Sequence, residues 1–168
     1  MASDPARDNS LKAVATVRAL LASGELNAEE DSRPDETIFR ITTEGPTPKV
    51  IARILLDKQR FIVHFFFTRP APPELRTKVA EYITRVNCGL IGGNLEMSFD
   101  SGTIRYKSSI DFTNVELPEL LVRNVMLSAI ENVEQLAMPL WDVLDEDAEP
   151  EAAAVTAGAR EDAVRFEP

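Results

Sequence analysis

The side chains that could carry acid–base or nucleophilic chemistry are few. The chain has one histidine, His64, and one cysteine, Cys88. These counts exclude a catalytic scheme with two histidines, an internal disulfide and a cysteine-based zinc site. No nucleophile or orienting acid is marked beside His64 in the sequence. We therefore expect no catalytic residue, no metal site and no cofactor.

A glycine-rich segment at residues 89–94 is the one candidate for phosphate binding. It lacks the Gly-Lys-Ser/Thr ending of a phosphate-binding loop and does not match the dinucleotide fingerprint. It also precedes a predicted strand, whereas phosphate-binding loops precede a helix. We interpret it as the end of a helix followed by a turn.

His64 lies in an aromatic-rich segment, residues 61–67, that is typical of a β-strand. Side chains alternate between the two faces of a strand, so Ile62, His64 and Phe66 share one face. The other face carries Phe61, Val63, Phe65 and Phe67. Both faces are apolar, which predicts a central strand covered on both sides. We expect the phenylalanine-rich face to contact the helices of the chain and the His64 face to contact a partner.

Basic side chains could share the His64 face. Arg53 lies in the strand-like segment before it, and Arg105 and Lys107 alternate with apolar residues in a later one. Together they would form a mixed apolar and basic surface, suited to an extended acidic or amphipathic segment or to the acidic tail of the chain itself. Alternatively, they are solvated strand residues, because one sequence does not reveal the register between strands. The predicted partner-binding residues are Arg53, Ile62, His64, Phe66 and Arg105.

The elements that would position these residues follow from hydrophobic periodicity and turn signals. The predicted order is a helix over about 10–23, strands at 37–43, 49–57 and 60–68, a helix over about 73–87, strands at 94–99 and 103–112, and a helix from Pro118. This order is an α+β pattern.

Some boundaries are more specific. The short connection at residues 57–59 predicts an antiparallel hairpin. Pro139 predicts a kink or a restart of the last helix near Met138. Residues 25–36, which are acidic and contain Pro34, are expected to connect elements rather than to form one.

The 168 residues are enough for one domain with tails, predicted as a disordered N-terminus (1–9), a domain (10–144) and a disordered acidic tail (145–168). No apolar run approaches the ~20 residues that a membrane-spanning helix needs. Residues 1–9 lack the features of a secretory signal, and there is a single cysteine. We therefore expect a cytoplasmic protein that does not insert into a membrane.

The charge of the chain is unevenly distributed. There are 18 Lys and Arg against 28 Asp and Glu, a net charge of −10, which disfavours nucleic acid as a partner. Residues 37–107 carry eleven bases and six acids, net +5, whereas residues 108–144 carry one base and six acids, net −5. This dipole could orient a partner or a second subunit, or the acids could serve solubility alone.

The second half of the sequence carries a family resemblance. Asn87 ends a predicted helix, residues 95–100 form a strand and turn that continue through Gly102, and residues 104–107 form a strand with an aromatic–basic ending. With the predicted order and the helix over residues 120–140, these features resemble the YbjN-like family. That family is grouped with type III secretion chaperones through a shared α-β-β-β-α-β-β-α fold. The sequence departs from the family at residues 93–95, where a glycine and an aromatic residue would stand closer together.

The resemblance implies a non-enzymatic domain, often dimeric, whose relatives bind extended segments of other proteins. We therefore predict a protein-interaction domain of chaperone or adaptor type, with an unidentified protein partner. A homodimer is expected because the second apolar face of the sheet has to be covered. The alternative is a regulatory module that binds a small ligand over the same face. An enzyme would need His64 within hydrogen-bond reach of a serine or carboxylate in a cleft.

Overall fold

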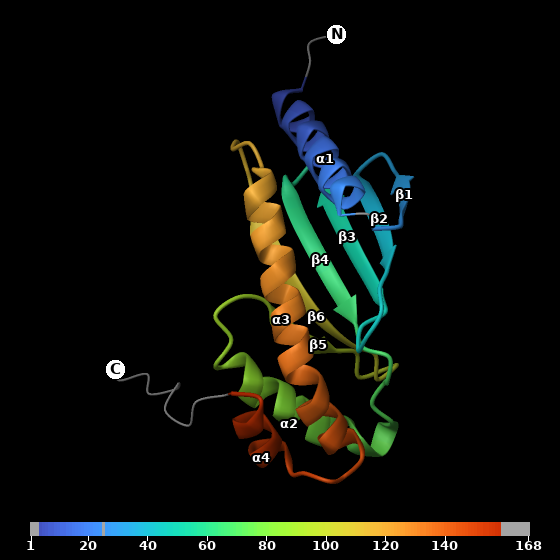
Figure 1. The fold of residues 1–168 in the computed structure, drawn as a ribbon, viewed down its shortest axis with the longest axis vertical. Coiled ribbons are helices and arrows are strands. Elements are labelled where there is room, and N and C mark those ends of the chain that lie inside the picture. The colour runs from blue at the N-terminus through green and yellow to red at the C-terminus, as the bar shows by residue number, and fades with distance from the viewer. Residues whose placement is uncertain (1–3, 25, 159–168) are drawn as a thin grey trace, which may run out of the picture.

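The computed structural model describes residues 4–24 and 26–158. Within them lie four α-helices, a short 3-10 helix and a six-stranded antiparallel sheet with the strand order β1-β2-β3-β4-β6-β5 (Figure 1). The elements are α1 (Pro5–Ser23), β1 (Ala28–Ser32), β2 (Glu36–Thr42), β3 (Lys49–Leu55), β4 (Arg60–Phe66), η1 (Pro73–Leu75), α2 (Arg76–Asn87), β5 (Asn94–Met97), β6 (Ile104–Asp111), α3 (Glu119–Leu144) and α4 (Pro150–Thr156). The predicted α+β class is confirmed, as is the antiparallel hairpin of β3 and β4.

Helices cover one face of the sheet. α1 lies against β3, and α3 runs along β4 and β6 on that same face, while α2 and α4 pack together beside β5 (Figure 1). Phe61, Val63 and Phe65 of β4 point into this core and are at most 3% exposed. The prediction that this side of β4 contacts the helices is therefore confirmed. No described helix is long and apolar enough to cross a membrane.

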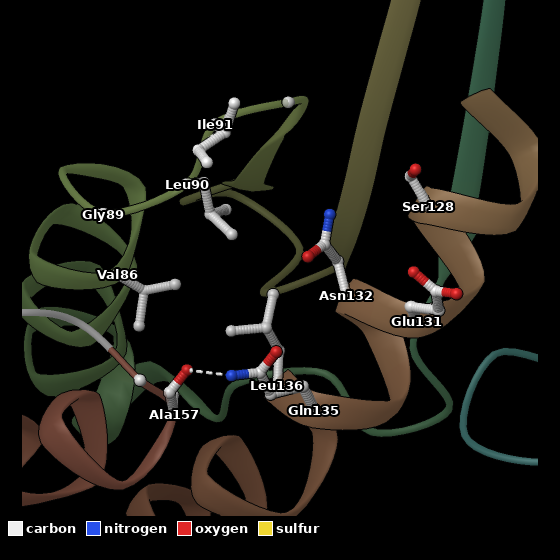
Figure 2. A pocket seen from close by; sticks show the side chains of 12 residues that line it. Val86, Gly89, Leu90, Ile91, Ser128, Glu131, Asn132, Gln135, Leu136 and Ala157 are labelled. Atoms are coloured by element: carbon white, nitrogen blue, oxygen red, sulfur yellow. Dashed lines mark hydrogen bonds between the residues drawn. The ribbon is translucent and has the colours of Figure 1, made fainter. Parts of the chain in front are cut away.

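The region after α3 differs from its prediction. Residues 145–158 were expected to be disordered, yet Pro150–Thr156 form α4, and only residues 159–168 of the predicted tail lie outside the described part. Ala153 and Ala154 are buried against the rest of the chain, because their small side chains let α4 approach α2 and α3 closely. A hydrogen bond also connects α3 to the end of α4, since Gln135 Nε2 donates to the Ala157 carbonyl over 2.9 Å (Figure 2).

α3 continues through Pro139 without interruption, so the predicted restart near Met138 is wrong. Proline removes one backbone hydrogen bond from a helix and crowds the preceding turn. The flanking residues Leu136 and Leu140 are fully buried, and this packing holds the segment in place. The buried Tyr82 hydroxyl also donates to the Leu136 carbonyl over 3.1 Å, which satisfies an acceptor in the affected turn.

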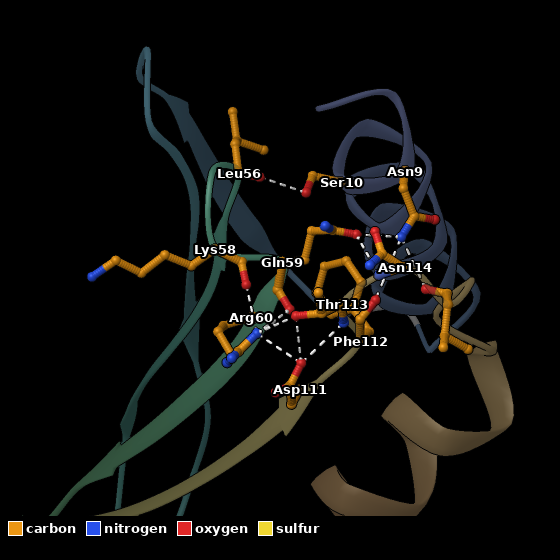
Figure 3. A network of polar contacts seen from close by, with 11 residues as sticks. Asn9, Ser10, Leu56, Lys58, Gln59, Arg60, Asp111, Phe112, Thr113 and Asn114 are labelled. Carbon is orange, nitrogen blue, oxygen red and sulfur yellow. Dashed lines mark hydrogen bonds and ion pairs between the residues drawn. The ribbon is translucent and has the colours of Figure 1, made fainter. Parts of the chain in front are cut away.

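The start of the chain is more ordered than predicted. α1 begins at Pro5, where the Asp4 side chain accepts a hydrogen bond from Ala6 N, so the expectation of disorder over residues 1–9 is wrong for residues 5–9. Residues 1–3 lie outside the described part. A contact between residues far apart in the chain holds the start of α1: Asn9 Nδ2 donates to Gln59 Oε1 over 2.8 Å (Figure 3).

Gln59 lies at the centre of a polar network that joins three parts of the fold. It is 4% exposed, and its Oε1 also accepts from Asn114 N over 3.0 Å (Figure 3). Beside it, Arg60 Nη1 donates to Asp111 Oδ1 and to Thr113 Oγ1, both over 2.7 Å. The network fixes α1 and the segment after β6 against the β3–β4 turn.

An edge strand, β1, occupies residues 28–32, inside the segment predicted to be a connection. Its acidic sequence has low strand propensity, but pairing with β2 supplies the backbone hydrogen bonds of the ladder. Ion pairs neutralise two of its three carboxylates: Arg18 contacts Glu30 at 2.7 Å and Arg40 contacts Asp31 at 3.1 Å. Tertiary contacts therefore override local propensity here.

Candidate functional site: the helix-free face of the sheet

The five predicted partner-binding residues lie on one face of the sheet. Arg53 is directly opposite Ile62 in the β3–β4 ladder, and Phe66 is directly opposite Arg105 in the β4–β6 ladder. His64 lies between Ile62 and Phe66 on the same side of β4. Residues directly opposite each other in a ladder point to the same face, so the structure brings all five together.

This face carries none of the described helices (Figure 1). We call it the open face. Its members follow from the register of the five ladders and are Glu29, Asp31, Glu36, Ile38, Arg40, Thr42, Lys49, Ile51, Arg53, Leu55, Arg60, Ile62, His64, Phe66, Asn94, Glu96, Arg105, Lys107, Ser109 and Asp111.

An apolar strip crosses the middle of the open face. Ile51, Ile62 and Phe66 are half-buried, although no described helix covers them. The His64 and Phe66 rings lie 6.1 Å apart between centroids, and Lys49 Nζ lies 5.2 Å from the centroid of Phe66. Such a strip leaves apolar surface for a partner to cover.

His64 is the least accessible member of the predicted contact set. It is 6% exposed because neighbouring side chains on three strands surround it. Burial, followed by the positive charge of Arg105, lowers the pKa of His64 from 6.5 to about 4. The imidazole is therefore neutral at neutral pH and belongs to the floor of the site rather than to its accessible surface.

Two acidic residues that the sequence analysis did not single out neutralise the basic ones. Arg53 Nε donates to Glu36 over 2.7 Å, and Glu36 is only 7% exposed. Glu96 accepts from Arg105 Nε over 2.7 Å and from Lys107 Nζ over 2.6 Å. The expected basic residues are therefore paired with carboxylates around an apolar strip, although Arg105 and Lys107 share one carboxylate and Lys49 has no ion pair in the described part of the chain. That arrangement suits an amphipathic segment better than a simply acidic one.

The Glu96 carboxylate is firmly ionised. Burial by itself would raise the pKa of Glu96, but the hydrogen bonds from Lys107 and Arg105 outweigh it and lower the pKa to about 2. This pairing follows from the alignment of β5 with β6, which places Glu96 directly opposite Arg105. Reading that position requires the register of β5 against β6, which one sequence does not give.

None of the described residues forms a hydrogen bond to the His64 imidazole, whereas a general base reaches its proton partner at about 2.6–3.2 Å. Within the same described residues, no cluster of three or more histidine, cysteine or acidic side chains has a metal-binding arrangement.

A separate cavity of about 440 Å³ lies between α3, the segment after α2 and the end of α4 (Figure 2). Val86, Leu90 and Leu136 line its apolar part. Two side-chain amides of its lining each donate a hydrogen bond within the chain, Asn132 to Tyr106 Oη over 2.9 Å and Gln135 to the Ala157 carbonyl. None of the predicted contact residues lines this cavity, which is distinct from the open face.

Comparison with protein-family models, curated proteins and solved structures gives no match for this chain. The resemblance to the YbjN-like family therefore stays a prediction from the residues that carry it.

Proposed function

We propose that this chain is a non-enzymatic protein-interaction domain of chaperone or adaptor type, and that it binds an amphipathic segment of a partner protein on the open face. One observation carries the proposal. The five predicted contact residues lie together on a helix-free sheet face with half-buried apolar side chains. The resemblance to the YbjN-like family, which implies a domain whose relatives bind extended segments of other proteins, supports the same function.

The chemistry of the open face favours an amphipathic occupant. Ile62 and Phe66 would contact the apolar side chains of the segment, which supplies the binding free energy through buried apolar area. The paired charges of Arg53, Arg105 and Glu96 at the sides of the strip would contact its polar residues and select its orientation. A second copy of the chain is the competing occupant, in agreement with the expected homodimer.

The test compares three forms of the tagged protein in its native host. These are the unchanged chain, the Phe66→Asp variant and a Phe99→Asp control. Phe99 is 59% exposed in the turn between β5 and β6, outside the open face. We expect one protein to be recovered in near-stoichiometric amount with the unchanged chain and the control, and at least tenfold less with Phe66→Asp. Equal recovery with all three forms would contradict the proposed face.

Photo-crosslinking separates a partner from a second copy. A photoreactive amino acid at position 62 should crosslink to a peptide of the partner, whereas the same group at the exposed Leu127 of α3 should not. If position 62 crosslinks only to another copy, and Phe66→Asp converts a dimer into a monomer in light scattering, then the open face is a dimer interface. That result would overturn the partner proposal.

A hollow beside the open face favours the second candidate, a small-ligand-binding regulatory module. It measures about 450 Å³, and Phe66, Glu96 and Arg105 are among the residues that line it. Recovery of a monomeric chain alone, with no crosslink from position 62, would favour this alternative. A ligand co-purifying with the unchanged chain but not with Phe66→Asp would identify it.

A further inference from the structure

An apolar groove lies on the other side of the sheet from the open face. Its floor is a row of three residues, Ile41, Val50 and Phe65, which are directly opposite one another in the β2–β3 and β3–β4 ladders. α3 forms one wall, and the segment between β2 and β3 forms the other. The other lining residues include Leu26, Glu44, Ile130 and Glu134.

The size of the groove fits one large side chain. Its volume is about 140 Å³, close to the ~150 Å³ of an apolar cavity that binds benzene in another protein. Two apolar residues of its lining reach solvent, since Leu26 is 39% exposed and Ile130 is 40% exposed. The groove is therefore open to an occupant but too small for a helix.

The charge at the groove has one sign. Glu44 and Glu134 line it and are exposed, and no lysine or arginine is part of the lining. Neither carboxylate forms an ion pair with another residue in the described part of the chain, in contrast to Glu36 and Glu96 on the open face. Two carboxylates beside an apolar groove complement a ligand that has a positively charged group next to an apolar one.

We propose that this groove is a second binding site, which takes a phenylalanine-sized apolar side chain followed by a lysine or arginine in a peptide segment of a partner. The apolar side chain contacts the accessible Leu26 and Ile130 at the mouth of the groove, over the buried Val50 and Phe65, and the cation contacts Glu44 and Glu134. The site is independent of the open face, because none of the open-face residues lines it.

The probe for this site is N-acetyl-Phe-Lys-amide, titrated at low ionic strength into the full chain labelled at its methyl groups. We expect saturable shifts at the methyl signals of Ile41, Val50 and Ile130, and none at Ile62 on the open face. N-acetyl-Phe-amide and N-acetyl-Phe-Glu-amide should bind at least fivefold more weakly, because they lack the cation. High salt should reduce the difference between the three probes.

A charge-reversed variant and its matched control test the role of the carboxylates. Glu134→Lys should weaken binding of the lysine probe at least fivefold. Glu131→Lys makes the same change of charge one turn earlier on α3, at an exposed residue that does not line the groove, and should weaken it less than twofold. The methyl spectrum of each free variant shows whether the fold is kept.

Three results would overturn the proposal. The first is the absence of saturable shifts at the groove residues. The second is equal binding of the lysine and glutamate probes. The third is an equal effect of the two α3 variants, which would show a response to overall charge rather than to this site. Because the readout is confined to groove methyl signals, these results are separate from any result on the open face.

Discussion

Glu96 on β5 lies directly opposite Arg105 on β6, and the Arg105 guanidinium donates to its carboxylate over 2.7 Å. Lys107 donates to the same carboxylate over 2.6 Å. One carboxylate thus pairs with two of the basic side chains next to the apolar strip of the open face. A partner of the proposed kind would therefore contact the face mainly through apolar surface.

The stability of the fold should depend on pH through His64. Its folded pKa of about 4 is below the unfolded value of 6.5, so the unfolded chain binds more protons between these values. The free energy of unfolding should be constant above about pH 6.5 and fall by about 3 kcal/mol as the pH is lowered toward 4. Urea denaturation followed by the fluorescence of the single tryptophan, Trp141, measures this.

A His64→Gln variant is the control for the pH dependence. Glutamine does not titrate, so the decrease between pH 6.5 and 4.5 should disappear. Carboxylates with lowered pKa values, such as Glu96, lose their stabilising contribution only at lower pH, as the pH falls from the ordinary value of 4.5 toward about 2. A variant that keeps the full decrease above pH 4.5 would show that another group is responsible.

Arg105 should set part of the low pKa of His64. After burial, its positive charge is the largest cause of the shift. An Arg105→Gln variant should therefore raise the pKa of His64 toward 6.5, whereas Arg40→Gln should leave it unchanged. The chain has one histidine, so a proton NMR titration of the imidazole gives an unambiguous answer. Equal shifts in the two variants would show that net charge, rather than this contact, acts on His64.

The pair of Arg53 and Glu36 should be a substantial contributor to stability. Glu36 is only 7% exposed, and in an Arg53→Met variant its carboxylate would keep Arg33, at 3.5 Å, as its ion-pair partner. We expect a loss of about 2 kcal/mol in the free energy of unfolding. Arg40→Met breaks a pair that is exposed on both sides and should cost less than about 0.5 kcal/mol. Chemical denaturation of both variants measures the two changes in the free energy of unfolding. Equal losses in the two variants would contradict the expectation.

The docking of α4 can be tested with two neighbouring alanines. Ala153 is 2% exposed, whereas the preceding residue, Ala152, is exposed. Ala153→Asp places a carboxylate in the contact with α2 and α3, which should release α4 and raise amide hydrogen exchange in residues 150–158 at least tenfold. Ala152→Asp should leave the exchange unchanged. Slow exchange in both variants would show that the burial of Ala153 does not hold α4 in place.

The sequence alone determined the parts of the fold that depend on neighbouring residues. Alternation in residues 61–67 identified the buried face of β4, because side chains in a strand repeat every second residue. A short connection predicted the β3–β4 hairpin for a similarly local reason. The same alternation placed Ile62, His64 and Phe66 on one face, so part of the candidate site was also predictable.

The other features could not be predicted in this way, because they depend on contacts between residues far apart in the chain. The acidic β1 is a strand through its pairing with β2, and the alanine-rich α4 is held by its contact with α2 and α3. Register between strands placed Glu36 beside Arg53 and Glu96 beside Arg105, so that the expected basic surface is partly neutralised. Burial of His64 has the same origin, since its neighbours come from three strands whose alignment no local pattern specifies.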